Sequence, residues 1–375
     1  MSALRLERRS SFPKWLNWVV PIFSIVAALV AGALLIAASG NNPLATYSRI
    51  LHRAFLTQDA FGATLVAATP LLFTGLAAAT AFKMGIFNIG GQGQYFMGTV
   101  AASGVGLLWG QSLGRAVIPF MILAGIAAGA AWAAIAGALR AWLNTNEIIT
   151  TLMLNYIAAN FASYLIFNSR SYWRLTTGSG LMFPQGKRLA EKSDWPPLTI
   201  GSLSIPFGFL VGIAVAFIVY VLYQHTRFGF EVKIIGDSPS AASYAGMRTK
   251  RKVLAVMGLS GALAGLGGAS DTGDFRHVLD PKGLGQAGYG YAGIVIAALA
   301  RLNPIAVVFV SILMGGLSNA GRALQGPDFP AGLVGTLQGF VLFFALGGEI
   351  LARYRVRRTH RVPVASGATG VGDAR

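Results

Sequence analysis

Long, uninterrupted runs of apolar residues constrain this chain more than any other feature. The run WVVPIFSIVAALVAGALLIAA, residues 18–38, has no charged residue over a length that crosses a bilayer as a helix, which takes about 20 residues. The runs do not alternate with period two, so they predict helices rather than barrel strands. Only 11% of the residues are charged, against about a quarter in soluble domains. The sequence therefore predicts an all-α polytopic membrane protein.

Ten apolar segments are expected to cross the membrane. An even number of crossings places both termini on one side, and the excess of Lys and Arg puts that side in the cytoplasm. The first run exceeds the roughly 7–15 apolar residues of a signal peptide, so we expect it to be retained. The expected spans are 18–38, 61–82, 86–109, 115–139, 148–167, 205–223, 253–269, 288–300, 304–317 and 332–351.

Three regions follow from this division of the chain. Residues 1–17 form a basic cytoplasmic segment, and residues 18–351 form the transmembrane domain. Within that domain, residues 224–252 are the longest cytoplasmic loop between spans. Residues 352–375 form a basic cytoplasmic tail, which is small, polar and expected to be disordered beyond Arg361.

The charge of the chain excludes several functions. A net charge of +17 would suggest nucleic acid in a soluble protein, but here no basic soluble face with interleaved aromatic residues exists. The cations suit loops that face the anionic leaflet of a membrane. There are no cysteines, and four scattered histidines make no ligand pair at helical spacing, so we expect no metal site. No P-loop motif occurs, so this chain is not expected to hydrolyse ATP by that route.

A short repeat relates the two halves of the chain. GGQGQYFMG, residues 90–98, is similar to GLGQAGYGYAG, residues 283–293, and each string opens an expected span. Five spans lie in each half, and because five is odd the halves would be inserted with opposite orientations. Inverted repeats with interrupted helices are a known way of building a transport path. We therefore predict two inverted five-helix halves with interrupted helices.

The repeat carries amides beside segments built for lipid. Backbone polar groups cannot remain unpaired in hydrocarbon, so a Gly-rich stretch with amides is buried in protein or lines a watery cavity. Each amide taken singly is better explained as a tie between helices. Taken together on related elements they favour a path for an uncharged polar solute. The candidates for this path are Asn88, Gln92, Gln94, Tyr95, Phe96, Asn155 and Gln286.

Acidic residues and glycines complete the interpretation of the spans. No acid falls in the middle of an expected span, where coupled carriers often place one. Asp271, Asp274 and Asp280 follow the seventh span, and we expect them in an exposed outer loop. GALAG, residues 261–265, spaces two glycines four residues apart and predicts close helix packing.

The cytoplasmic loop predicts a short helix of its own. Asp237 or Ser238 would cap it, Pro239 would occupy its first turn, and Gly246 would end it. A small helix with little charge suits docking into a groove of a partner protein. The alternative is a helix that lies on the membrane surface. We expect the helix to expose Ala241, Ala242, Tyr244 and Ala245.

Two of these motifs resemble those of a known family. GIFNIGGQGQYFMG and GDSPSAASYAGM are similar to motifs of ABC importer permeases for branched-chain amino acids, simple sugars and nucleosides, with Met247 where the family often has Ile. LNTNEIITTLMLNYIA, residues 143–158, resembles the nucleoside subgroup most closely. The resemblance implies a bacterial inner-membrane permease for nucleosides, or else simple sugars such as ribose. It implies that the chain has no catalytic residue and no cofactor, because ATP is hydrolysed by partner subunits.

The resemblance also implies partners for the chain. These are ABC ATPase subunits, a second permease that is identical or related, and a binding protein outside the membrane that delivers a small polar solute. The coupling segment that docks into the ATPase would comprise Gly236, Pro239, Ala241, Ala242, Tyr244, Ala245 and Gly246. Two other classes stay open: a secondary transporter independent of an ATPase, which would need an intramembrane ionisable residue, and a membrane-embedded enzyme, for which only the outer aspartates offer a cluster.

Overall fold

Helices dominate the computed structural model, which describes residues 3–8, 16–57, 59–324 and 332–359. Each of the ten apolar segments predicted from the sequence coincides with a helix. These helices are α1 (Leu16–Ala38), α3 (Ala60–Phe82), α4 (Gly91–Leu113), α5 (Val117–Leu143), α6 (Glu147–Phe167), α7 (Phe207–His225), α10 (Thr249–Asp271), α12 (Tyr289–Leu299), α13 (Pro304–Ala323) and α14 (Leu333–Arg353).

Shorter elements connect these helices, and the sequence analysis predicted only α9 among them. The helices are α2 (Pro43–Leu51), α8 (Arg227–Asp237), α9 (Pro239–Tyr244) and α11 (Pro281–Ala287). The helical turns are η1 (His52–Leu56), η2 (Gly114–Ala116), η3 (Gly178–Leu181), η4 (Glu191–Ser193) and η5 (Thr272–Arg276). The strands are β1 (Ala3–Arg8), β2 (Leu198–Ile200), β3 (Leu203–Ile205) and β4 (Tyr354–Thr359), and β2 pairs antiparallel with β3.

Fewer than ten helices in the described residues are long and apolar enough to cross a membrane. Six helical stretches qualify by length and composition, and α4 with α5 count as one of them because η2 joins them. A seventh is formed if Ile25–Ala38 and Pro43–Leu56, which meet at 117°, are one bent span. At 11 residues, α12 is too short to cross alone. The chain is a polytopic helical protein, and ten crossings stay a prediction.

The chain divides into two compact units, one of residues 1–32 with 339–375 and one of residues 33–338. In the first unit, β1 and β4 pair antiparallel, with Ala3 opposite Thr359. This pairing joins the basic N-terminal segment to the start of the expected tail. The disorder predicted beyond Arg361 lies outside the described residues. In the second unit, a buried apolar cluster contains Ile36, Leu333 and Leu337.

The core of the larger unit is built around α10, which packs against α5, α3 and α4. The contact between α10 and α5 is made by glycines on both helices. A Cβ added at Gly261 would collide with the carbonyl oxygen of Gly129, and one added at Gly265 would collide with that of Gly125. The close packing predicted from GALAG is therefore confirmed. Only glycine permits two helix backbones to approach so closely.

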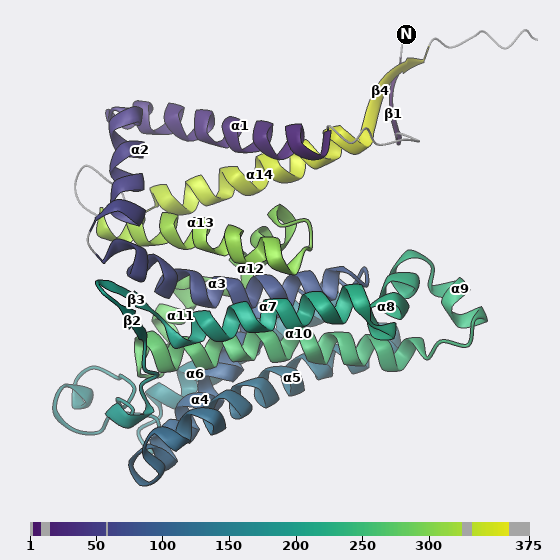
Figure 1. The fold of residues 1–375 in the computed structure, drawn as a ribbon. Helices are drawn as coiled ribbons and strands as arrows, with labels where there is room; N and C mark the ends of the chain where they lie inside the picture. Colours follow the sequence, from purple (N-terminus) through teal and green to yellow (C-terminus); the bar gives the residue numbers. More distant parts are fainter. Residues whose placement is uncertain (1–2, 9–15, 58, 325–331, 360–375) are drawn as a thin grey trace, which may run out of the picture. The chain divides into compact units, whose positions relative to one another are not determined.

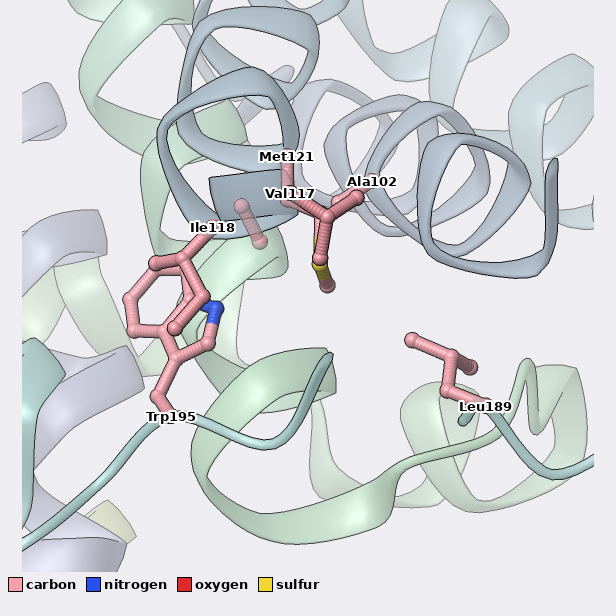
Figure 2. Close-up of a cluster of buried hydrophobic side chains, with 7 residues drawn as sticks. Ala102, Val117, Ile118, Met121, Leu189 and Trp195 are labelled. Carbon is pink, nitrogen blue, oxygen red and sulfur yellow. The ribbon is translucent and has the colours of Figure 1, made fainter. Parts of the chain in front are cut away.

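The long segment between α6 and α7 packs over one end of the bundle, as its tryptophans suggest. Figure 2 shows Leu189 and Trp195 of this segment lying against Met121 and its neighbours on α5. Trp195 is buried, and its backbone N–H donates to the Gly273 carbonyl oxygen at 2.9 Å. The segment is thereby fixed to the ends of α4, α5 and α10, although most of it has no regular secondary structure.

Candidate functional site

The first Gly/Gln string starts α4 after a break inside the bundle. The chain turns at Gly85, where φ is +72°, and runs without helix until α4 begins at Gly91. The first N–H groups of a helix have no partner within that helix, and lipid offers none. The side chain of Asn155 on α6 supplies one: its Oδ1 accepts from the Gly93 N–H at 2.7 Å, and its Nδ2 donates to the Ile89 carbonyl at 2.9 Å.

The second Gly/Gln string contains a break of the same kind. α11 ends at Ala287, Gly288 adopts a φ of +57°, and α12 begins at Tyr289. Gln92 of the first string meets this break. Its Oε1 accepts from the Gly290 N–H at 2.7 Å, and its Nε2 donates to the Leu284 carbonyl at 3.1 Å. The two strings that the sequence relates to each other are thus in direct contact. The second string contains a break between two helices, whereas the first follows the connection between α3 and α4, so interrupted helices in both halves stay a prediction.

A pair of amides links the start of α4 to two further helices, α10 and α3. Asn88 and Gln94 exchange two hydrogen bonds of 3.0 Å through their side chains. Asn88 also donates to Ser260 Oγ on α10 at 2.9 Å, and Ser260 donates to the Ala77 carbonyl of α3 at 2.7 Å. Asn88, Gln94 and Ser260 are all buried. In this conformation the amides bond to protein groups, and Asn88 connects the start of α4 to α10 through Ser260.

The other path candidates divide into buried and exposed residues. Tyr95 and Phe96 are fully buried on α4, and the Tyr95 ring lies 5.6 Å from that of Tyr289 on α12. The Tyr95 hydroxyl makes no hydrogen bond of standard geometry with the described residues. Gln286 lies on α11 between Leu284 and Gly290, which Gln92 bonds, but it is exposed. The structure therefore brings the path candidates to one region, where all are buried except Gln286.

A charged residue flanks the break before α4. Lys83 follows the last residue of α3, and its Nζ lies 4.7 Å from the centre of the Tyr223 ring. Burial lowers the pKa of Lys83, because removing an ammonium from water disfavours its charged form. The aromatic face compensates part of that cost through a cation–π contact.

The sequence analysis placed Asp271 and Asp274 wrongly, in an exposed outer loop, whereas Asp280 does lie in the connection before α11, with a side chain that is 41% exposed. α10 continues to Asp271 and then into η5, so Asp271 is only 3% exposed at the end of a candidate span. Arg276 neutralises it: the guanidinium lies 2.7 Å from Asp271 and 3.0 Å from Asp280. Asp274 accepts from the Gly208 N–H at 2.9 Å. The signal that was missed is the spacing of Asp271, Arg276 and Asp280, which allows one cation to meet both acids.

The short helix of the cytoplasmic loop is confirmed as α9. Ser238 caps it, Pro239 is in its first turn, and Gly246 follows with a φ of +75°. Figure 1 shows α9 at the tip of its loop, beyond the ends of α7 and α10. Tyr244 is 95% exposed, whereas Ala242 is fully buried. The expected exposure of Ala242 was therefore wrong, because this side chain faces its own loop.

The other residues of the predicted coupling segment are exposed or half-buried. Pro239, Ala241, Ala245 and Gly246 are exposed, and Gly236 is half-buried. The preceding helix, α8, was not predicted. It is capped by Thr226 and buries Val232 and Ile235. The cytoplasmic loop therefore contains two consecutive helices, α8 and α9.

Several known proteins that are similar to this chain are permeases. The sequence model of a family described as "Branched-chain amino acid transport system / permease component" matches residues 60–346. The "Glucose ABC transporter permease protein TsgB13" of Haloferax volcanii is 36% identical over 392 residues, covering 99% of each chain. The "Guanosine ABC transporter permease protein NupP" of Bacillus subtilis is 33% identical, covering 80% of this chain and 84% of that protein. The "Nucleoside ABC transporter permease protein NupB" of Lactococcus lactis is 29% identical, covering 87% and 90%. No solved structure matches the chain.

A helical bundle with amide-capped, interrupted helices and such relatives defines a polytopic membrane permease of the ABC transporter class. The chain belongs to the branched-chain amino acid transport system permease family.

Proposed function

We propose that this chain is the permease subunit of an ATP-driven importer and forms the path for a small, neutral, polar solute. The observation that carries the proposal is the contact between α4 and α12, where Gln92 bonds both sides of the second helix break. Two interrupted helices that meet inside a bundle make a junction that can separate without exposing bare backbone to lipid. Ten spans in two inverted halves, with both termini in the cytoplasm, complete the proposed topology.

The solute that we propose is a nucleoside, with a simple sugar as the alternative. Relatives named for guanosine, nucleosides and glucose support both, and all of these solutes present neutral sugar hydroxyls. Amides can donate to and accept from hydroxyls. The proposed path residues are Asn88, Gln92, Gln94, Tyr95, Phe96, Asn155 and Gln286. Because six of these side chains bond or pack within the protein here, the solute would reach them only after α4 and α12 move apart.

The proposed partners are ATPase subunits, a second identical or related permease, and a binding protein outside the membrane. The segment that would dock into the ATPase is α9 with its flanks, from Gly236 to Gly246. Its support is the exposed Tyr244 at the tip of the loop and the near absence of charge on α9. ATP hydrolysis would take place on the partner chains, with no cofactor on this one.

Reconstituted vesicles test this function directly. The permease is co-purified with its partner chains, and uptake of labelled guanosine and of labelled glucose is measured with ATP inside. We expect ATP-dependent guanosine uptake. If the vesicles take up glucose but not guanosine, the solute is a simple sugar rather than a nucleoside. Uptake that persists when the ATPase is inactivated would instead support a secondary transporter, for which Asp271 is an ionisable residue within a candidate span.

The docking role of α9 has its own variant. Tyr244→Asp introduces a charge on the exposed face of α9 and should abolish stimulated ATP hydrolysis while the chain still inserts. Leu181→Asp is the matched control, because Leu181 is 70% exposed on a different segment. Normal coupling in Tyr244→Asp would remove α9 from the docking surface.

A further inference from the structure

A basic pocket lies between α8 and the start of α10. It has a volume of about 550 Å³ and is open to the surface. The turn after α9 closes one side of it through Gly246 and Met247. Four cationic side chains line it: Arg227, Arg248, Arg251 and Lys252.

Most of this charge is not compensated within the described part of the chain. Lys252 is paired, because its Nζ lies 2.7 Å from Glu231 and 4.6 Å from the centre of the Phe228 ring. Arg227, Arg248 and Arg251 make no ion pair with the described residues, and all three are exposed. Three unpaired guanidinium groups around one cavity attract an anion, and guanidinium forks match phosphate oxygens in geometry.

The backbone adds to this preference. Arg248 is the N-cap residue of α10, and no side chain caps that end of the helix. The Thr249 N–H donates to the Met247 carbonyl at 2.9 Å, which leaves the N–H groups of Lys250 and Arg251 at this end of α10, where the positive end of the helix dipole also lies. Side chains and backbone favour the same kind of ligand.

The position of the pocket along the helices indicates the source of the anion. Arg227 is two residues beyond the end of α7, and Arg251 is in the first turn of the candidate span Thr249–Arg276. That span has 28 residues, or about 42 Å of helix, which exceeds the roughly 30 Å of the hydrocarbon core. A helix of this length extends beyond the hydrocarbon core, and its first turn, which carries Lys250 and Arg251, suits the headgroup layer, where lipid phosphates are found.

An apolar side chain at the same depth supports a lipid. Phe230 lines the pocket and is 61% exposed on α8, while the opposite face of α8 buries Val232 and Ile235. A short helix with basic residues beside an exposed aromatic ring is typical of helices that lie in the membrane interface. We propose that this pocket binds the phosphate of an anionic phospholipid headgroup, held by Arg227, Arg248 and Arg251. The proposal does not depend on the solute. The pocket adjoins the proposed docking segment, because Ala245 and Gly246 line it.

Binding of phosphatidylglycerol to the full-length chain tests this site. The purified permease in detergent is titrated with phosphatidylglycerol or phosphatidylcholine, and bound lipid is counted by native mass spectrometry. The double variant Arg227→Gln with Arg251→Gln should bind phosphatidylglycerol about 25-fold more weakly, at roughly fivefold per arginine. Binding of phosphatidylcholine should not change.

Matched variants separate the site from general charge effects. Arg115→Gln with Lys192→Gln removes two exposed cations from η2 and η4, which contact each other away from the pocket, and should leave binding unchanged. Arg227→Lys with Arg251→Lys should retain most of it. Equal weakening by both glutamine pairs would overturn the proposal.

Two further results would also overturn the lipid assignment. If inorganic phosphate binds the pocket as tightly as phosphatidylglycerol does, the pocket is a site for a free anion. If phosphate at millimolar concentration displaces no bound phosphatidylglycerol, the lipid assignment is supported. If the Arg227→Gln, Arg251→Gln variant binds phosphatidylglycerol normally but no longer co-purifies with partner chains, the pocket instead receives an acidic segment of a protein.

Discussion

Replacing Gln92 with leucine tests whether amides cap the interrupted helices. Gln92→Leu removes the acceptor for the Gly290 N–H and the donor to the Leu284 carbonyl. Both backbone groups belong to buried residues. A buried donor or acceptor left without a partner costs about 1–3 kcal/mol, so the two together predict a loss of about 2–6 kcal/mol in the free energy of unfolding.

The assay is equilibrium unfolding of the purified permease in mixed micelles. The control is Asn160→Leu, because Asn160 is exposed on α6 and donates only to the Tyr156 carbonyl of its own helix. We expect that variant to lie within about 0.5 kcal/mol of the parent.

The result also distinguishes capping from solute contact. A Gln92→Leu chain as stable as the parent would refute the capping argument, because two orphaned backbone groups must have a measurable cost. If stability holds while uptake falls, Gln92 acts on the solute alone. If both fall together, the junction has a structural role that transport requires.

Three further predictions concern packing, pH and transport. Gly265→Ala should lower the free energy of unfolding by about 1–3 kcal/mol, because the new Cβ meets the α5 backbone, whereas Gly258→Ala on the same helix meets nothing within 4 Å and should not destabilise. Burial lowers the pKa of His277, and the nearby Asp194 carboxylate raises it by a smaller amount. The neutral imidazole therefore contributes stability that is complete above the unfolded-state pKa of about 6.5 and is lost as the pH falls below that value. The melting temperature should therefore drop between pH 7 and pH 5, and His277→Gln should flatten that drop. Gln94→Leu should weaken uptake without preventing assembly, and unchanged uptake kinetics would remove Gln94 from the path.

The apolar runs predict the long helices well because burial in lipid requires nothing more than length and composition. All ten predicted segments are helical, and GALAG predicts the close contact of α10 with α5. The ends of helices are harder to predict. The seventh segment was predicted to stop at residue 269, because Asp271 and Arg276 look like loop residues when taken one at a time. Their mutual neutralisation, which no local pattern shows, lets the helix continue.

The candidate site was predicted in type but not in detail. The sequence analysis expected amides on a solute path, and the structure gives Gln92 and Asn155 backbone partners distant in sequence, as with Asn155 and Gly93, while Asn88 and Gln94 bond each other. In α9, six residues are too few for a periodic pattern, so the sequence could not show that Ala242 faces inward and Tyr244 outward. The pairing of β1 with β4 joins the two ends of the chain, and composition alone gives no sign of it.

The continuity of α10 has a mechanical consequence. It begins a few residues after α9 and runs unbroken for 23 residues, or about 34 Å, to Asp271. Because its glycines lock it against α5, the pair would shift as one stiff rod rather than bend. A displacement that passes the turn at Gly246 and reaches the start of α10 would therefore be transmitted along the helix to the carboxylates and guanidinium at its far end.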